Sequence, residues 1–281
     1  MKLGTFVRPY SMDPAELDKV FAPLKEMGFT ACQLAYKPEV FLKEDAEAIR
    51  AAADRNGIEI SAHFIGFRDP YTSWDLKYAY LMSGLTSPTF RAMRMEYLMK
   101  GCEFVKWLGI TDLIIHAGNI PNNPFDPNYT ALVACIRVLA KRCKDLGLNL
   151  LFETGAETAV SLLRMINDVG MDNLFINFDT GNGALYGNYG ALDAVYMYGH
   201  LIRNVHVKDG LPPTDPDKLG LETALGDGVV DFDGVMKKLF ELNYDRFMII
   251  EREVGTGEQQ KLDVLKAKKY IEDMLAKRDQ K

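Results

Sequence analysis

The stretch Arg203-Asn204-Val205-His206-Val207-Lys208-Asp209 predicts a short buried strand that ends in a histidine and two charged residues. Side chains alternate along a strand, so the two valines face one way while the asparagine, the histidine and the lysine face the other. Polar side chains on an inner face and at a carboxyl end are unusual for a plain core. They are expected at the open end of a parallel barrel, where active sites are built.

Three other stretches follow the same rule, in which an apolar run ends in an acidic residue. They are Leu148–Glu153, Leu174–Asp179 and Phe247–Glu251. Each is followed by glycine or polar residues and then by a helical pattern. Four consecutive predicted strands therefore bring Glu, Asp, His and Glu to one end of the molecule.

Strand and helix patterns alternate eight times along the chain. The predicted strands are Lys2–Val7, Thr30–Tyr36, Ile58–Phe64, Asp112–His116, Leu148–Glu153, Leu174–Asp179, Ile202–Val207 and Arg246–Glu251. Strands that are apolar on both faces and alternate with amphipathic helices indicate parallel pairing under helical cover. Eight such units predict an α/β fold, a (β/α)8 TIM barrel, as a single domain over residues 1–281. An open doubly wound sheet is the structural alternative.

Composition narrows the class of protein. The 281 residues are 48% hydrophobic and 26% charged, with a net charge of −6, which is ordinary for a soluble globular protein. The acidic balance argues against a nucleic-acid partner. We expect no membrane association and a cytoplasmic location, because the sequence has no signal-peptide pattern and no apolar run that would span a bilayer. The four cysteines lack metal-type spacing and predict reduced, buried thiols.

The four strand-end residues form a set of candidate metal ligands, Glu153, Asp179, His206 and Glu251. Carboxylate oxygens with one imidazole nitrogen suit Mn²⁺, Mg²⁺, Co²⁺ or a catalytic Zn²⁺. Three crowded carboxylates repel one another, and a divalent cation relieves that repulsion while leaving positions for substrate oxygens. We predict one divalent ion, with Mn²⁺ favoured. Each acid taken singly would more commonly cap a helix or pair with a base.

Strand parity indicates a second polar layer below these residues. Asn177 precedes Asp179 by two positions, and Asn204 precedes His206 by two. Both asparagines should point into the barrel, where they would either orient the ligands or fill a polar layer.

Seven motifs in a fixed order carry a resemblance to a known family. They are His63 in Ser-Ala-His-Phe, His116 in Ile-His-Ala-Gly, Glu153 in Leu-Phe-Glu-Thr, Asp179 in Phe-Asp-Thr-Gly-Asn, His206 in Val-His-Val-Lys-Asp, the turn from Gly226 to Phe232, and Glu251 in Ile-Ile-Glu-Arg-Glu. With these motifs the chain resembles the xylose-isomerase-like TIM barrel superfamily, in particular the sugar phosphate isomerase/epimerase group. That group includes ketose 3-epimerases, hydroxypyruvate isomerases and inosose dehydratases. The resemblance covers essentially the whole chain and does not select one substrate.

The resemblance implies a mechanism. A sugar or polyol ketone would chelate the metal ion, which polarises the carbonyl and stabilises an enediolate. Glu153 and Glu251 would act as catalytic acid/base groups as well as ligands, one removing a proton and the other returning it. Asp179 and His206 would be ligands only. Barrels of this family often pair, so a homodimer is also expected.

Three further residues are candidate substrate contacts. The resemblance places His116 and Lys208 on substrate oxygens, and Lys208 shares a strand face with His206. His63 is either a substrate contact or a packed, hydrogen-bonded barrel histidine.

Two departures from the family limit the substrate. Asn182 stands where related endonucleases carry a further histidine, which argues against phosphodiester cleavage. The turn Gly226–Gly228 precedes a helix and would suit a phosphate, but Asp231 and Asp233 occupy it as cap residues and would repel an anion. We therefore predict a neutral sugar or polyol.

Two aromatic segments begin at the expected catalytic end. One holds Tyr71, Trp74, Tyr78 and Tyr80, and the other holds Tyr186, Tyr189, Tyr196 and Tyr198. They suit a lid, a subunit interface or local packing.

Three functions remain open at this stage. The first is a metal-dependent sugar isomerase or epimerase. The second is a dehydratase or lyase on the same barrel, acting on an inosose or an oxidised glycoside by elimination. The third is a non-catalytic sugar-binding barrel, against which the presence of both glutamates argues.

Overall fold

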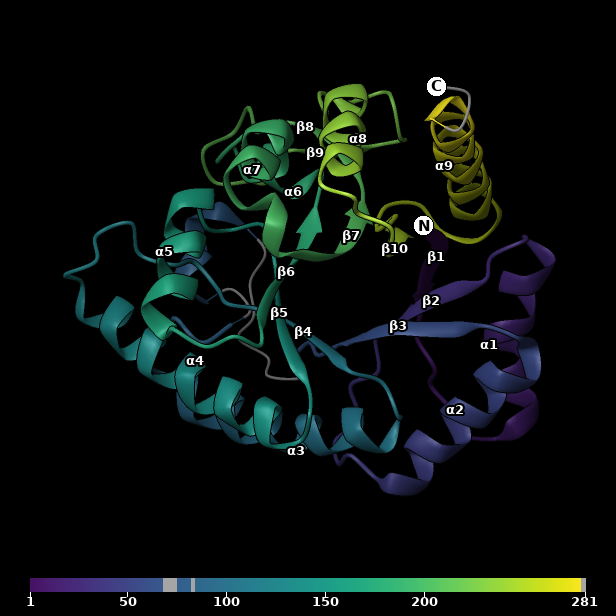
Figure 1. The fold of residues 1–281 in the computed structure, drawn as a ribbon, viewed down its shortest axis with the longest axis horizontal. Coiled ribbons are helices and arrows are strands. Elements are labelled where there is room, and N and C mark those ends of the chain that lie inside the picture. The colour runs from purple at the N-terminus through teal and green to yellow at the C-terminus, as the bar shows by residue number, and fades with distance from the viewer. Residues whose placement is uncertain (68–74, 82–83, 279–281) are drawn as a thin grey trace.

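The computed structural model describes residues 1–67, 75–81 and 84–278, and its centre is a closed barrel of parallel strands (Figure 1). Neighbouring strands run in the order β1-β10-β7-β6-β5-β4-β3-β2, so the first and last strands close the barrel. Their bounds are β1 Lys2–Val7, β2 Ala31–Leu34, β3 Glu59–Phe64, β4 Asp112–His116, β5 Asn149–Glu153, β6 Leu174–Asp179, β7 Ile202–Val207 and β10 Phe247–Ile250. The predicted TIM barrel is confirmed, and the doubly wound sheet is excluded.

Helices surround the barrel and bury the outer faces of its strands (Figure 1). The longer ones are α1 Pro14–Glu26, α2 Lys43–Asn56, α3 Arg91–Trp107, α4 Pro127–Asp145, α5 Ala159–Val169, α7 Ala191–Tyr198, α8 Phe232–Glu241 and α9 Gly257–Arg278. Short elements complete the loops, namely η1 Leu76–Leu81, α6 Asn182–Leu185, η2 Gly199–Leu201, and the antiparallel pair β8 Asp209–Leu211 and β9 Leu221–Thr223. Within the described ranges, no helix has both the length and the apolar character needed to cross a membrane.

Helix boundaries follow local chemistry where capping residues are present. Asp13 caps α1 by accepting hydrogen bonds from the amides of Ala15 and Glu16, at 2.9 and 3.2 Å. The helical pattern of the sequence predicts that the second helix begins near Pro38, whereas α2 begins at Lys43. Phe41 is buried against the ring of Phe104, and this packing holds the preceding segment outside the helix.

The barrel interior divides into an apolar part and a polar part. A small cluster of Ala62, Ile114 and Leu151 fills the apolar part, with Phe64 and Phe175 packed against it. The polar part lies beneath the candidate metal ligands and consists of the buried Gln33, Asn177 and Asn204. Burying polar groups costs free energy, so a polar barrel centre of this kind indicates a functional site and not a contribution to stability.

The four cysteines are free thiols, as expected from their spacing. Three are buried, and the sulfur atoms of Cys102 and Cys143 lie 3.6 Å apart.

Candidate metal centre

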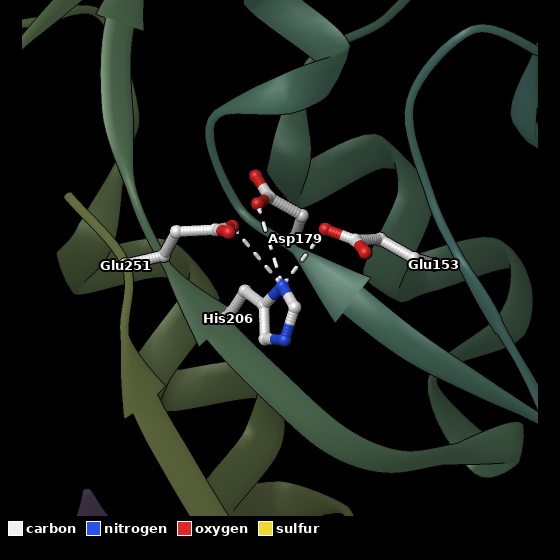
Figure 2. A group of neighbouring side chains, drawn as sticks. All are labelled: Glu153, Asp179, His206 and Glu251. Carbon is white, nitrogen blue, oxygen red and sulfur yellow. Dashed lines mark hydrogen bonds and ion pairs between the residues drawn. The ribbon is translucent and has the colours of Figure 1, made fainter. Parts of the chain in front are cut away.

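Four neighbouring strands deliver the predicted ligands to the same end of the barrel. Glu153 and Asp179 end β5 and β6, His206 lies in β7, and Glu251 follows β10 directly. One donor atom from each lies within 4.8 Å of the others, and the three carboxylates converge on the imidazole (Figure 2). Nδ1 of His206 is 2.9 Å from Oε1 of Glu153 and 3.2 Å from Oε2 of Glu251. These four residues are called the metal group below.

The metal group has the properties that a divalent cation requires. All four side chains are buried. Oδ1 of Asp179 is held by the backbone amides of Gly181 and Asn182, at 2.8 and 2.7 Å. Its Oδ2 is buried and accepts no hydrogen bond from the described residues, so this oxygen is available to a cation. Three carboxylates and one imidazole nitrogen form a set that can bind a divalent metal ion.

The other side of the His206 ring is held by amide side chains. Oε1 of Gln33 lies 3.0 Å from Nε2 of His206, and Nδ2 of Asn204 donates to the same oxygen at 3.0 Å. Nδ2 of Asn177 lies 3.1 Å from Nε2. A proton on Nε2 that is donated to Gln33 leaves the Nδ1 lone pair directed at the three carboxylates, as a metal ligand requires.

Lys208 supplies a buried positive charge beside the metal group. Its Nζ is 3.0 Å from Oε2 of Glu251, 3.5 Å from Oδ2 of Asp179 and 2.7 Å from Oε2 of Glu253. The stem of the lysine passes over Gly181, where an added Cβ would lie 2.8 Å from the lysine Cγ. A glycine is therefore needed at that position for the lysine to reach the metal group.

These contacts set the protonation states of the metal-free group. Burial alone would raise the pKa of Asp179 and of Glu251, but Lys208 and His206 outweigh it and hold both below their ordinary values. Burial opposes the charge on His206 and Lys208, but the neighbouring carboxylates raise the pKa of each well above its ordinary value. The negative charge of the carboxylates is thus offset in part by an imidazolium and an ammonium.

The other two predicted substrate contacts lie in different places. His116 ends β4 at the catalytic end, and its Nε2 is 3.6 Å from Oε2 of Glu153. His63 does not join them. Its ring packs against Phe41 and Phe104 outside the barrel, its Nδ1 hydrogen-bonds to the carbonyl of Leu34 at 3.1 Å, and burial lowers its pKa to about 4. The structure therefore places His63 in the layer between strands and helices, as a packed barrel histidine.

The turn Gly226–Gly228 holds an anion that belongs to the chain itself. The buried carboxylate of Asp209 accepts hydrogen bonds from the amides of Gly226 and Gly228, each at 3.0 Å, and of Val230 at 3.2 Å. A Cβ on Gly228 would lie 2.1 Å from Oδ1 of Asp209, so the close approach requires glycine. Asp231 caps α8 through the amide of Gly234, as expected. These backbone donors are already engaged and do not face a substrate phosphate.

The aromatic segments, for which a lid, a subunit interface and local packing were all open, are described only in part. Tyr71 and Trp74 and the side chain of Tyr80 lie outside the described residues. Tyr198 is fully buried and packs against Phe178, so it belongs to the core. Tyr186 is buried at the catalytic end, whereas Tyr196 is exposed on α7.

Sequence reasoning did not identify two residues of the site. Gln33 is the polar residue of the otherwise apolar β2 stretch Ala31–Leu34, and that contrast was the available signal. Glu253 contacts Lys208 from an exposed position two residues after Glu251, where an acidic residue has no distinguishing pattern.

The fold and site define a TIM barrel with a buried cluster of acids and one histidine at the carboxyl ends of its strands. The family model described as xylose isomerase-like TIM barrel matches residues 21–274, and the chain belongs to that family. An inosose dehydratase from Geobacillus kaustophilus is 26% identical over 291 aligned positions, which cover 92% of this chain and 87% of the relative.

Two solved structures extend the comparison. A xylose isomerase domain protein from Planctomyces limnophilus superposes with a TM-score of 0.86 at 27% identity, covering 98% of this chain and 97% of the other. A D-allulose 3-epimerase from Methylomonas sp., solved with D-allulose, gives 0.71 at 18% identity, covering 97% and 96%. The latter likeness shows a common fold.

Proposed function

We propose that the protein is a divalent-metal-dependent isomerase or epimerase of a sugar or polyol ketone. The observation that carries this proposal is the placement of two glutamates on either side of one imidazole. Glu153 comes from β5 and Glu251 follows β10, and each carboxylate lies within 3.2 Å of Nδ1 of His206. Two carboxylates that face one cation position from different strands can exchange protons with both faces of a bound ketone.

Different residues have different roles in the proposed reaction. A divalent ion in the metal group would supply a Lewis acid that draws electron density from a substrate carbonyl. One of the two glutamates removes the proton from the carbon next to that carbonyl, and an enediolate results. The other glutamate returns a proton to the opposite face, giving an epimer, or to the neighbouring carbon, giving an isomer. Asp179 and His206, together with the two glutamates, would hold the ion, and Mn²⁺ is the ion that we propose.

Lys208 and His116 complete the site on the substrate side. The ammonium of Lys208 lies 3.0 Å from Glu251 and is buried, so it can hold a substrate oxygen and stabilise negative charge on it. His116 lies beside Glu153 and can hold a second oxygen. An uncharged substrate is supported by the Asp209 carboxylate, which already engages the amides of the Gly226–Gly228 turn.

A dehydratase is the second candidate function, and the inosose dehydratase relative favours it. It shares the first proton abstraction with the isomerase. The enediolate then expels a hydroxyl group at the β carbon as water, instead of taking up a proton on a new face. The two functions differ in product, because one conserves mass and the other loses water.

A deuterium-exchange screen tests both candidates. The protein is stripped of metal, reloaded with Mn²⁺, Mg²⁺ or Co²⁺, and incubated in D₂O with free ketoses and inososes. We expect metal-dependent deuterium uptake at the carbon next to the carbonyl, with an epimer or isomer as product. A dehydrated product would establish the lyase instead.

Glutamine variants separate catalysis from binding. Glu153→Gln and Glu251→Gln should each lower exchange by at least about a hundredfold, the usual contribution of a general acid or base. Glu157→Gln is the matched control, because burial raises the pKa of Glu157 to about 8 and the wild-type side chain is already neutral at pH 7. If both catalytic variants matched the wild type on every sugar, the barrel would bind sugars without turning them over.

A further inference from the structure

The ammonium of Lys208 forms its hydrogen bonds outside the metal group. Its Nζ donates to Oε2 of Glu253 at 2.7 Å and to Oδ1 of Asn182 at 3.4 Å. Oε2 of Glu251 and Oδ2 of Asp179 are also close, at 3.0 and 3.5 Å, but among the described residues neither oxygen accepts a hydrogen bond. The lysine therefore brings its charge to the metal group without occupying the oxygens that would bind an ion.

The contact with Glu253 is the shortest of the four, and it does not compete with a metal ion. A divalent ion held by Glu251 and Asp179 would repel the ammonium and use the lone pairs of their oxygens. Glu253 and Asn182 lie outside the metal group, and of these two only Glu253 is an acid. Glu253 is therefore the negatively charged partner that Lys208 can keep when an ion is bound.

An exposed glutamate does not by itself fix the position of a lysine. The side chain of Glu253 is 57% exposed, and exposed ion pairs contribute little because two long side chains must be ordered. The backbone of Glu253, however, is held in place. Its amide donates to both carboxylate oxygens of Glu222, at 3.1 and 3.2 Å. The segment after β10 is thus fixed at the residue whose side chain holds the lysine.

The anchor of this segment is the buried carboxylate of Glu222 in β9. Nη1 of Arg252 donates to Oε1 of Glu222 at 2.7 Å and to the carbonyl of Thr223 at 3.1 Å. Nε of the same arginine donates to Oδ2 of Asp263 in α9 at 2.9 Å. A buried carboxylate costs free energy unless it is paired, and here the pairing joins three elements. The β8–β9 pair, the end of β10 and α9 together hold the backbone that carries Glu253.

We propose that Glu253 is a positioning residue for Lys208. Its carboxylate draws the hydrogen bonds of the ammonium away from Glu251 and Asp179, so the oxygens of the metal group stay open to a divalent ion. The ammonium stays beside the metal group, where it can hold a substrate oxygen. That last role rests on the proposed function, whereas the effect on the metal group does not.

A double-mutant cycle in metal binding tests this role. Calorimetry gives the Kd of Mn²⁺ for the metal-stripped wild type, Glu253→Ala, Lys208→Met and the double variant. In Glu253→Ala the ammonium should turn to the carboxylates of the metal group and compete with the ion, so Kd should rise about tenfold, within the usual range for residues in contact. In the Lys208→Met background the same substitution should change Kd by less than about twofold.

Glu258→Ala is the matched control, because Glu258 is an exposed acid in the first turn of α9, and this variant should keep the wild-type Kd. An equal rise in Kd with and without Lys208 would show that Glu253 acts on the ion through its charge alone. An unchanged Kd in Glu253→Ala would show that the lysine does not need Glu253. Either result would overturn the positioning role.

The deuterium-exchange screen separates this role from the proposed function. Mn²⁺ affinities that depend on Lys208 in this way, in a protein that exchanges none of the ketoses or inososes, would support the positioning role and reject the proposed function. Exchange by the wild type, with a Glu253→Ala effect that is the same in both backgrounds, would support the proposed function and reject the positioning role.

Discussion

Oε1 of Gln33 lies 3.0 Å from Nε2 of His206, on the side of the imidazole opposite to the three carboxylates. Gln33 is fully buried in β2, across the barrel from the metal group. The amide oxygen is an acceptor, so it favours the ring form that carries its proton on Nε2 and keeps Nδ1 free for a cation. We therefore expect Gln33 to influence metal affinity, although it would touch neither the ion nor the substrate.

Replacing Gln33 by leucine should weaken metal binding by about 10- to 100-fold, the usual effect of losing the partner of a ligating histidine. Gln33→Glu keeps an acceptor at the same place and should retain tight binding. Competitive titration of Mn²⁺ gives the affinities, and ¹⁵N chemical shifts of the imidazole report the ring form. Unchanged affinity in Gln33→Leu would show that the amide only fills space.

Lys208→Met should destabilise the metal-free protein by about 3 kcal/mol, since the buried carboxylates of Asp179 and Glu251 lose a close positive partner. A bound divalent ion restores the balance of charge. Added Mn²⁺ should therefore raise Tm more in the variant than in the wild type. Lys218→Met, at an exposed lysine, is the control. An equal metal-induced shift in Lys208→Met and wild type would contradict this account of the charge balance.

His63 should make stability depend on pH below neutrality. Burial lowers the pKa of His63 from 6.5 to about 4, so as pH falls below 6.5 the unfolded chain takes up a proton that the folded chain does not. Between pH 6.5 and 5 the folded state should lose about 2 kcal/mol through this residue. Denaturant unfolding at pH 7 and pH 5 should show a smaller loss of unfolding free energy in His63→Gln than in the wild type. Equal losses in the two proteins would refute the assignment of this pH dependence to His63.

Glu157 makes stability depend on pH in the opposite direction. Burial raises its pKa from 4.5 to about 8, so the folded chain keeps a proton that the unfolded chain has lost at neutral pH. The stability that Glu157 contributes in its neutral form is fully present below pH 4.5 and declines as the pH rises to about 8. Glu157→Gln should be more stable than wild type by about 3 kcal/mol at pH 7, with the difference vanishing near pH 4.5. A stability gain that does not change with pH would exclude burial of the carboxyl as the cause.

The alternation of strand and helix patterns was enough to predict the barrel and its strands. The bounds of β1, β4 and β7 agree with the expected ranges. The start of α2 could not be read in this way. It depends on Phe41, whose burial against Phe104 is a contact between distant parts of the chain.

The sequence by itself determined the fold and the identity of the metal group, because residues at the ends of parallel strands must meet at one end of a barrel. Only the tertiary structure decided how the neighbours of that group are arranged. Strand parity does not tell which of several inward or outward positions lies against a given ring, so it left His63 open between a substrate contact and a packed barrel histidine, and it did not identify Gln33. Those placements depend on the closure of the barrel and on side-chain packing, which bring together residues such as Gln33 and His206 that are far apart in the chain.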